Sequence, residues 1–81
     1  MNIKVVYFAR YRELLGRDDE YLEGVFATVE DVRKALVEKG AGYALLAESN
    51  LMCARNQDLC KLAEPVAEGD EVAFFPPVTG G

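Results

Sequence analysis

The chain has 81 residues, 51% of them hydrophobic and 28% charged, which suits one small folded domain and leaves no room for a second. Fourteen acidic residues against nine basic ones give a formal net charge of −5, which argues against nucleic acid and anionic membranes as partners because both attract clustered Lys and Arg. No apolar run reaches the roughly 18 residues of a membrane span, and we find no secretory signal, so we expect a cytoplasmic protein.

The composition also excludes several kinds of catalytic and metal site. The chain contains no His, which removes the imidazole base, the Ser-His and Cys-His nucleophile pairs and histidine metal ligands. Cys53 and Cys60 lack the C-x-x-C spacing of redox and zinc sites, so we interpret them as structural residues on neighbouring strands; a disulfide or redox pair is the alternative. We therefore expect no metal site, and we do not expect the chain to be an enzyme on its own.

The first third of the chain predicts a strand, a short helix and a second strand. Residues 3–8 are β-branched and aromatic with almost no polar interruption, which favours a central strand buried on both faces. Apolar residues at helical spacing then predict one or two helical turns that end at Gly16. Residues 20–26 give a weaker strand pattern.

The main helix is expected over residues 28–39. Thr28 can accept a hydrogen bond from the amide of Asp31, which is the usual signature of a helix start. A stripe of apolar side chains at helical spacing follows, and Gly40 ends the pattern. Residues 43–48 suggest a short second helix.

Three short strands complete the prediction, over residues 51–55, 59–62 and 71–75. One main helix cannot cover both faces of a sheet. We therefore predict an α+β fold in which a mixed sheet curls around helix 28–39 and leaves its other face open to solvent. The first and last strands are the most apolar and are expected side by side at the centre.

The last strand also indicates a partner site. Side chains alternate along a strand, so if Phe74 lies in the core, Phe75 points outward. An exposed Phe beside a charged surface is typical of a docking residue. Cover of Phe75 by a neighbouring loop is the alternative.

The sequence closes with Pro-Pro-Val-Thr-Gly-Gly. Proline cannot donate a ladder hydrogen bond and favours an extended backbone, so we expect a folded domain over residues 1–75 and a projecting tail over residues 76–81. Glycine at the end of such a tail brings no side-chain clash and would let it thread a narrow channel in another protein.

The reactive group of this tail is the α-carboxylate of Gly81, taken as the terminal residue. It is ionised at neutral pH and is a fair nucleophile. Attack on the α-phosphate of ATP would give an acyl-adenylate, from which sulfur could form a thiocarboxylate and a lysine amine could form an isopeptide. The nucleotide, the Mg²⁺ and the catalytic groups would belong to a partner, so this chain would be the substrate and carrier.

Three segments of the chain can be compared with known families: the ending Phe-Phe-Pro-Pro-Val-Thr-Gly-Gly, the sequence Phe-Ala-Arg-Tyr-Arg-Glu-Leu at residues 8–14, and Asn56-Gln57 ahead of Leu59. Together they resemble the small-subunit family of molybdopterin synthase. The resemblance spans the whole chain, and the octapeptide is its specific part, because ubiquitin and the thiamin sulfur carrier share a terminal Gly-Gly. It implies a ubiquitin-like β-grasp fold, consistent with the predicted element order.

The resemblance also implies a reaction route. An adenylating activating enzyme, which holds ATP and Mg²⁺, would charge Gly81, and a sulfur donor would convert it to a thiocarboxylate. The tail would then enter the active site of the large synthase subunit and give sulfur to cyclic pyranopterin monophosphate to form molybdopterin. The family arrangement is a heterotetramer in which two small subunits lie at opposite ends of a large-subunit dimer.

The same resemblance assigns roles to individual positions. Gly80 would let the tail thread, and Phe8, Leu59 and Phe75 would form the apolar docking surface for both partners. It implies no cofactor bound by this chain. Cys53 and Cys60 have no role as sulfur carriers in this route.

Two other classes of function stay open. A ubiquitin-like protein modifier, joined to lysines through Gly81, begins with the same adenylate and predicts a ladder of conjugates. A module that serves only for docking predicts that Gly81 is dispensable. Only the Phe-Phe-Pro-Pro context of the ending favours the sulfur carrier, and it does so through the resemblance.

Overall fold

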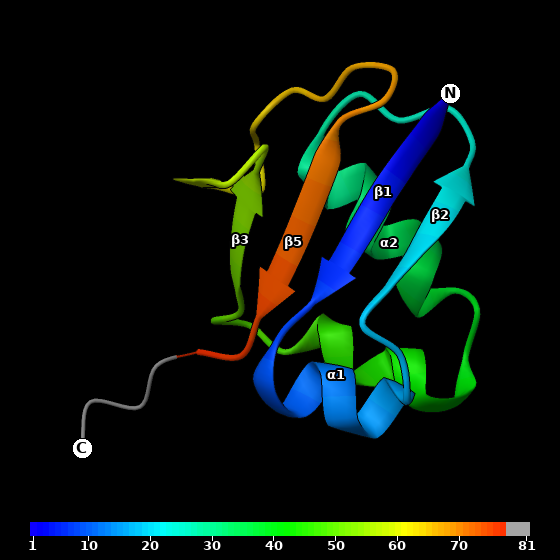
Figure 1. The fold of residues 1–81 in the computed structure, drawn as a ribbon, viewed down its shortest axis with the longest axis vertical. Coiled ribbons are helices and arrows are strands. Elements are labelled where there is room, and N and C mark those ends of the chain that lie inside the picture. Colours follow the sequence, from blue (N-terminus) through cyan, green and yellow to red (C-terminus); the bar gives the residue numbers. More distant parts are fainter. Residues whose placement is uncertain (78–81) are drawn as a thin grey trace.

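Five strands and three helices make up residues 1–77, the part of the chain that the computed structural model describes (Figure 1). The strands are β1 (Asn2–Tyr7), β2 (Asp19–Glu23), β3 (Met52–Arg55), β4 (Asp58–Cys60) and β5 (Glu71–Phe75). The helices are α1 (Ala9–Leu15), α2 (Val29–Val37) and the 3-10 helix η1 (Ala41–Ala47). None of these helices is long and apolar enough to cross a membrane.

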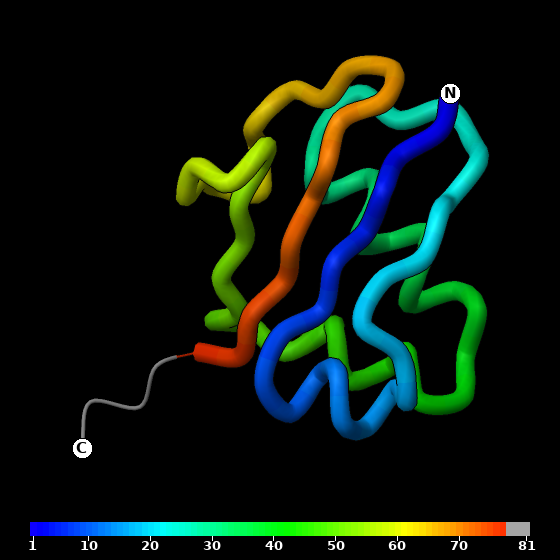
Figure 2. The backbone as a smooth tube through the Cα atoms, viewed as in Figure 1, coloured from blue at the N-terminus to red at the C-terminus, as the bar shows by residue number. Residues whose placement is uncertain are grey.

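The strands form one mixed sheet in the order β2-β1-β5-β3-β4. β1 and β5 are parallel, whereas the other neighbouring strands are antiparallel. Figures 1 and 2 show β1 and β5 side by side in the middle of the sheet, with α2 behind it. The prediction of a mixed sheet with the first and last strands at its centre is therefore confirmed.

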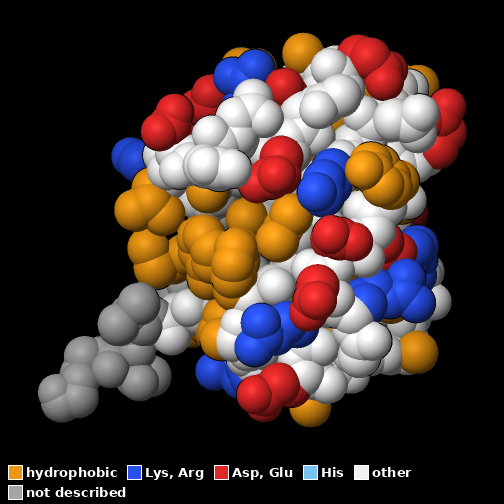
Figure 3. Space-filling model, in the orientation of Figure 1, with side chains coloured by type: hydrophobic (Ala, Val, Ile, Leu, Met, Phe, Trp, Pro, Cys, Tyr) orange, Lys and Arg blue, Asp and Glu red, His pale blue; other side chains and the backbone are white. Residues whose placement is uncertain are grey.

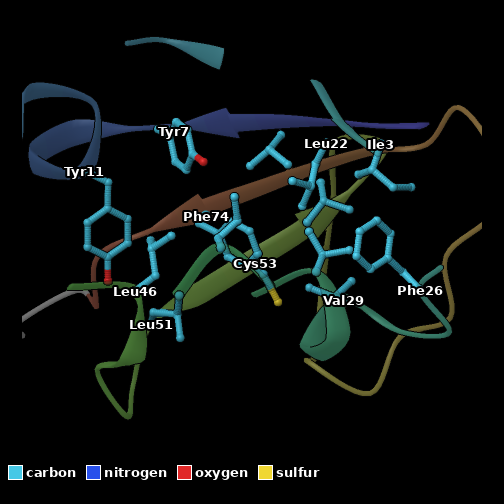
Figure 4. Packing of buried hydrophobic residues seen from close by; sticks show 14 residues of the cluster. Ile3, Tyr7, Tyr11, Leu22, Phe26, Val29, Leu46, Leu51, Cys53 and Phe74 are labelled. Atoms are coloured by element: carbon cyan, nitrogen blue, oxygen red, sulfur yellow. The ribbon is translucent and has the colours of Figure 1, made fainter. Parts of the chain in front are cut away.

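The core fills the space between the sheet and α2 (Figure 4). Its largest fully buried side chains are Tyr7, Tyr11, Phe74, Ile3, Leu36, Leu46, Val5, Val29, Val32 and Val72. They come from both central strands and from all three helices, so a single cluster joins the secondary-structure elements. Burial of this apolar surface is the main force that stabilises a domain of this size.

Residues of β1 alternate between the two faces of the sheet. Ile3, Val5 and Tyr7 are fully buried on the α2 side, whereas Lys4 and Val6 on the other face are only half-buried. The prediction that this strand is buried on both faces is therefore wrong. The apolar run is continuous, but α2 covers only one face of the sheet.

The predicted helix signals are confirmed. Gly16 ends α1 in the left-handed conformation, with φ of 71°. At the start of α2, the Asp31 amide donates to Thr28 Oγ1, and the Thr28 amide donates to Asp31 Oδ2. In this reciprocal pair, the side chain of each residue accepts a hydrogen bond from the amide of the other at the helix start.

Several predicted boundaries differ from the structure. β2 ends at Glu23, after which Phe26 turns into the core outside any strand. β4 is an edge strand that pairs with β3 over only three positions before the chain turns at Lys61. α2 ends at Val37, and the helix expected over residues 43–48 is η1, which begins earlier, at Ala41.

A carboxylate at the edge of the core ties three elements together. Glu20 of β2 accepts hydrogen bonds from the hydroxyls of Tyr7 and Tyr43, at 2.8 and 2.7 Å, and from Lys39 Nζ at 3.0 Å. Partial burial opposes ionisation of Glu20. The hydrogen bonds from Tyr43, Tyr7 and Lys39 together outweigh this effect and hold the pKa of Glu20 below its ordinary value of 4.5.

Acid is therefore expected to weaken the fold in part through Glu20. A carboxyl group whose pKa is lower in the folded chain stabilises that chain above the unfolded pKa, and the stabilisation is lost as the pH falls through the folded pKa. For Glu20→Gln, the free energy of unfolding should be about 1 to 3 kcal/mol lower at neutral pH. It should also fall less than that of the unmodified chain between about pH 5 and pH 2. Urea unfolding across this pH range measures how the free energy of unfolding of each chain depends on pH. The same dependence in both chains would contradict the role assigned to Glu20.

Candidate functional site

The sheet face opposite α2 carries a row of large apolar side chains at the end of β5. Phe74 is fully buried in the core, and Phe75 points to the opposite face, as the alternation predicts. The Phe75 ring lies 5.0 Å from the Phe8 ring between centroids, with an interplanar angle of 42°. On its other side, Phe75 lies directly opposite Met52 of β3. Phe8 and Met52 thus flank Phe75. Contact with Phe8 covers part of the Phe75 ring, so this side chain is half-buried and not fully exposed.

The third predicted docking residue, Leu59, lies on the same face. Leu59 of β4 is opposite Ala54 of β3, which is opposite Ala73 of β5. Residues directly opposite in antiparallel strands share a face, so the register brings Leu59 to the side that carries Phe75. We call the surface formed by Phe8, Met52, Leu59 and Phe75, with the two alanines between them, the outer patch.

The outer patch is open to solvent in the described part of the chain. Leu59 is 70% exposed, Phe8 43% and Met52 37%. Figure 3 shows hydrophobic side chains gathered on the β3 and β5 side of this face, whereas acidic and basic side chains are interspersed over the remainder. An exposed apolar area with a charged surround is typical of a protein-docking surface.

The chain leaves the sheet beside the outer patch. β5 ends at Phe75, and Pro76 and Pro77 follow outside any strand, as the missing amide donors predict. We call Pro76 and Pro77 the tail root. Gly80 and Gly81, to which the sequence assigns the threading and the chemistry, lie outside the described residues.

A polar network fixes the β3–β4 hairpin against the start of β5. Asn56 Oδ1 accepts the Glu71 amide at 2.9 Å, and Asn56 Nδ2 donates to Asp70 at 3.1 Å. Arg55 Nε also donates to Asp70, at 2.7 Å. Burial opposes ionisation of Asp70, but hydrogen bonds from Arg55, Asn56 and the Ala67 amide lower its pKa below the ordinary value. The network thereby holds in place the hairpin that carries Leu59.

The sequence places Asn56 and Gln57 between two predicted strands, but it does not indicate this pairing. The Asn-Gln pair between two apolar runs signals a turn, and Asn56 and Gln57 do adopt the positive φ angles of 49° and 72°. The partners of Asn56 lie 14 and 15 residues away at the start of β5, and no local pattern indicates them.

The two cysteines lie on neighbouring strands, as predicted. Cys53 of β3 and Cys60 of β4 are directly opposite, with their Sγ atoms 3.7 Å apart as free thiols. Burial raises the pKa of Cys53 to about 12 and also raises that of Cys60, so both thiols are protonated at neutral pH. Cys53 pairs with Phe74 and faces the core, away from the outer patch.

Comparison with known proteins gives a family for this arrangement. The ThiS family matches residues 5–81 of the chain. The chain belongs to the ThiS family. Its relatives in this family include the molybdopterin synthase sulfur carrier subunit of Haemophilus influenzae, 51% identical over 80 residues that cover 98% of this chain and 99% of the relative. The subunit of the same name from Escherichia coli is 46% identical with the same coverage. The family that the terminal octapeptide indicated is thus confirmed.

Solved structures share the ThiS-family fold. The crystal structure of the small archaeal modifier protein 1 of Haloferax volcanii matches with a TM-score of 0.77 and 28% identity, covering 95% of this chain and 98% of that one. A chain from the Helicobacter pylori complex of subunits 1 and 2 of molybdopterin-converting factor matches with a TM-score of 0.69 over the full length of both chains. At 22% identity this second match supports the fold alone. The predicted β-grasp fold is confirmed.

Proposed function

We propose that this chain is the sulfur carrier subunit of a molybdopterin synthase, in which Gly81 carries the sulfur as a terminal thiocarboxylate. The observation that carries the proposal is the position of the outer patch beside the tail root, in a chain that resembles sulfur carrier subunits over its full length. Residues 1–75 would be the body that partners hold, and residues 76–81 would be the tail that they act upon.

The charging step needs groups that a partner supplies. The Gly81 carboxylate attacks the α-phosphate of ATP and pyrophosphate leaves, which produces the acyl-adenylate. The sulfur of hydrosulfide or of a persulfide donor then attacks the acyl carbon and AMP leaves. Hydrosulfide gives the thiocarboxylate directly, whereas the acyl disulfide formed from a persulfide is cleaved by a thiol, which leaves with the donor sulfur as a disulfide. ATP and Mg²⁺ belong to the activating enzyme in this scheme, and the chain itself binds no cofactor.

The delivery step needs a docking surface close to the tail. We infer that Phe8, Leu59 and Phe75 dock the carrier on the large subunit while the tail enters its active site. Gly80 would let the tail pass through a narrow entrance because it has no side chain. There the sulfur passes to cyclic pyranopterin monophosphate, and hydrolysis returns the carboxylate. The assembly would contain two carriers and two large subunits.

Intact mass spectrometry tests the charging step. The chain is incubated with ATP, Mg²⁺, a sulfur source and the activating enzyme, and exchange of one carboxylate oxygen for sulfur should add about 16 Da. The control reactions omit ATP or use a chain that ends at Gly80. A chain that gains no ATP-dependent mass with its own activating enzyme is not a sulfur carrier.

The protein modifier is the second candidate function. Its support is the structural similarity to the small archaeal modifier protein of Haloferax volcanii. Both functions begin with the same adenylate, but a modifier would end as an isopeptide on lysines of other proteins. A ladder of higher-mass conjugates that depends on Gly81 would favour the modifier, whereas a single species with added sulfur favours the carrier.

A further inference from the structure

Met52 is the one large side chain of the outer patch that the proposed function leaves without a role. It lies directly opposite Phe75 and is 37% exposed, close to the 43% of Phe8. Side chains directly opposite in antiparallel strands come within contact distance. Phe8, Phe75 and Met52 therefore form a continuous row across the end of the sheet, next to the tail root.

Beyond Met52 and Phe75, the next residues on this face of β3 and β5 are small. The next residue of β3 on the same face is Ala54, which lies between Ala73 of β5 and Leu59 of β4. Both alanines have a single side-chain carbon and are only 4% exposed, so larger neighbouring side chains cover them. Met52 has Phe75 on one side and the two small alanines further along the sheet, and it keeps 37% of its surface exposed. Because its side chain is unbranched and has three rotatable bonds, it can extend toward Phe75 or over the alanines toward Leu59.

The proposed function, on which this inference rests, places two different proteins over the same row. The activating enzyme and the large synthase subunit must each take the tail into an active site. Each must therefore approach the tail root and lie against the side chains beside it. A surface made only of rigid rings and branched side chains can complement one shape well, whereas an unbranched thioether adapts to more than one.

We propose that Met52 is a docking residue of the outer patch and the adaptable one, which adjusts its side chain so that a single surface fits the apolar surfaces of both partners. Phe8 and Phe75 supply a fixed apolar contact, since their rings pack on each other at 5.0 Å. Met52 fills whatever gap remains beside these rings in each complex.

Binding of the full chain to each partner, measured by titration calorimetry, tests this role. Met52→Ala should weaken binding to both the large subunit and the activating enzyme by about tenfold, the loss typical of an interface anchor. Met52→Leu keeps the side-chain volume but adds a branch, and should weaken binding to at least one partner by more than about threefold. The matched control is Tyr21→Ala, because Tyr21 is 72% exposed on the same sheet face but lies on β2. This control should bind both partners as the unmodified chain does.

Thermal unfolding shows whether each variant is folded at the assay temperature. If Met52→Ala is not, Met52→Gln takes its place, since it keeps the length of the side chain, adds a polar end and should weaken binding to the same extent. Unchanged binding of the folded Ala or Gln variant to both partners overturns the docking role. If Met52→Leu binds both partners as tightly as the unmodified chain does, the proposal that Met52 adapts its side chain to each partner is wrong.

These outcomes remain distinct from failure of the proposed function itself. If the unmodified chain gains sulfur and Phe75→Ala weakens binding while the Met52 variants do not, the carrier role stands and the inference on Met52 is wrong. If the unmodified chain gains no ATP-dependent mass, the carrier role fails.

Discussion

Removal of Gly81 is expected to abolish sulfur transfer while the domain stays folded and still docks. In the proposed function all the chemistry takes place on the terminal carboxylate. A chain that ends at Gly80 retains a carboxylate, but this group falls short of the partner's reacting atoms by about 3.5 Å, the span of one extended residue. Since a misplacement of about 1 Å can cost a factor of about 100 in rate, we expect a loss of at least about 1,000-fold.

The rate of molybdopterin formation by the reconstituted synthase, with ATP, Mg²⁺, the activating enzyme and a sulfur source present, measures this loss over charging and delivery together. Thr79→Ser is the matched control, because it changes the tail by one methyl group and leaves its length unchanged. The shortened chain should bind the large subunit within a few-fold of the unmodified chain, as it keeps the whole outer patch. Sulfur transfer at an undiminished rate would show that Gly81 is not the site of the chemistry.

Phe74→Ala and Phe75→Ala are expected to have opposite effects, although the two residues are neighbours of the same type. Phe74 is fully buried among core side chains of the central strand. Its truncation should reduce the free energy of unfolding by about 3 to 5 kcal/mol. Small domains have only about 5 to 15 kcal/mol in total, so this variant should be close to unfolding.

Phe75 is half-buried beside the tail root, on the sheet face away from the core, where its ring packs against Phe8 and lies opposite Met52. Phe75→Ala should therefore lower the free energy of unfolding by less than about 1.5 kcal/mol and weaken binding to the large subunit by at least about tenfold. Urea unfolding and titration calorimetry on both variants measure the two effects. A stability loss for Phe75→Ala as large as that for Phe74→Ala would place Phe75 in the core. Unchanged binding would remove it from the docking surface.

Local signals in the sequence predicted a large part of the fold. The extent of β5, the glycine that ends α1 and the Thr28–Asp31 cap each depend on a few adjacent residues, and the structure has all three. The central position of β1 and β5 followed from their high apolar content. The burial of β1 was overestimated, because an apolar run does not reveal how many layers cover the sheet.

Less of the candidate site than of the fold could be predicted from the sequence. Alternation along β5 predicted that Phe75 faces outward, but Phe8 and Leu59 came from resemblance alone. Met52 was missed because its place beside Phe75 depends on the register of β3 against β5. That register brings together residues 23 positions apart, and the network around Asn56 and Asp70 holds the β3–β4 hairpin against β5. Neither feature has a signature within a short window of sequence.

The parallel alignment of β1 and β5 has a mechanical consequence. Tension applied to the tail would reach the domain through Phe75, at the end of the central strand. With the body held near Met1, this tension would run along the strands and load the backbone bonds between β1 and β5 in shear. Bonds loaded in shear share the force and must break together, whereas bonds at an unzipping edge break one at a time. An enzyme that pulls on the tail should therefore dissociate from it before the carrier domain unfolds.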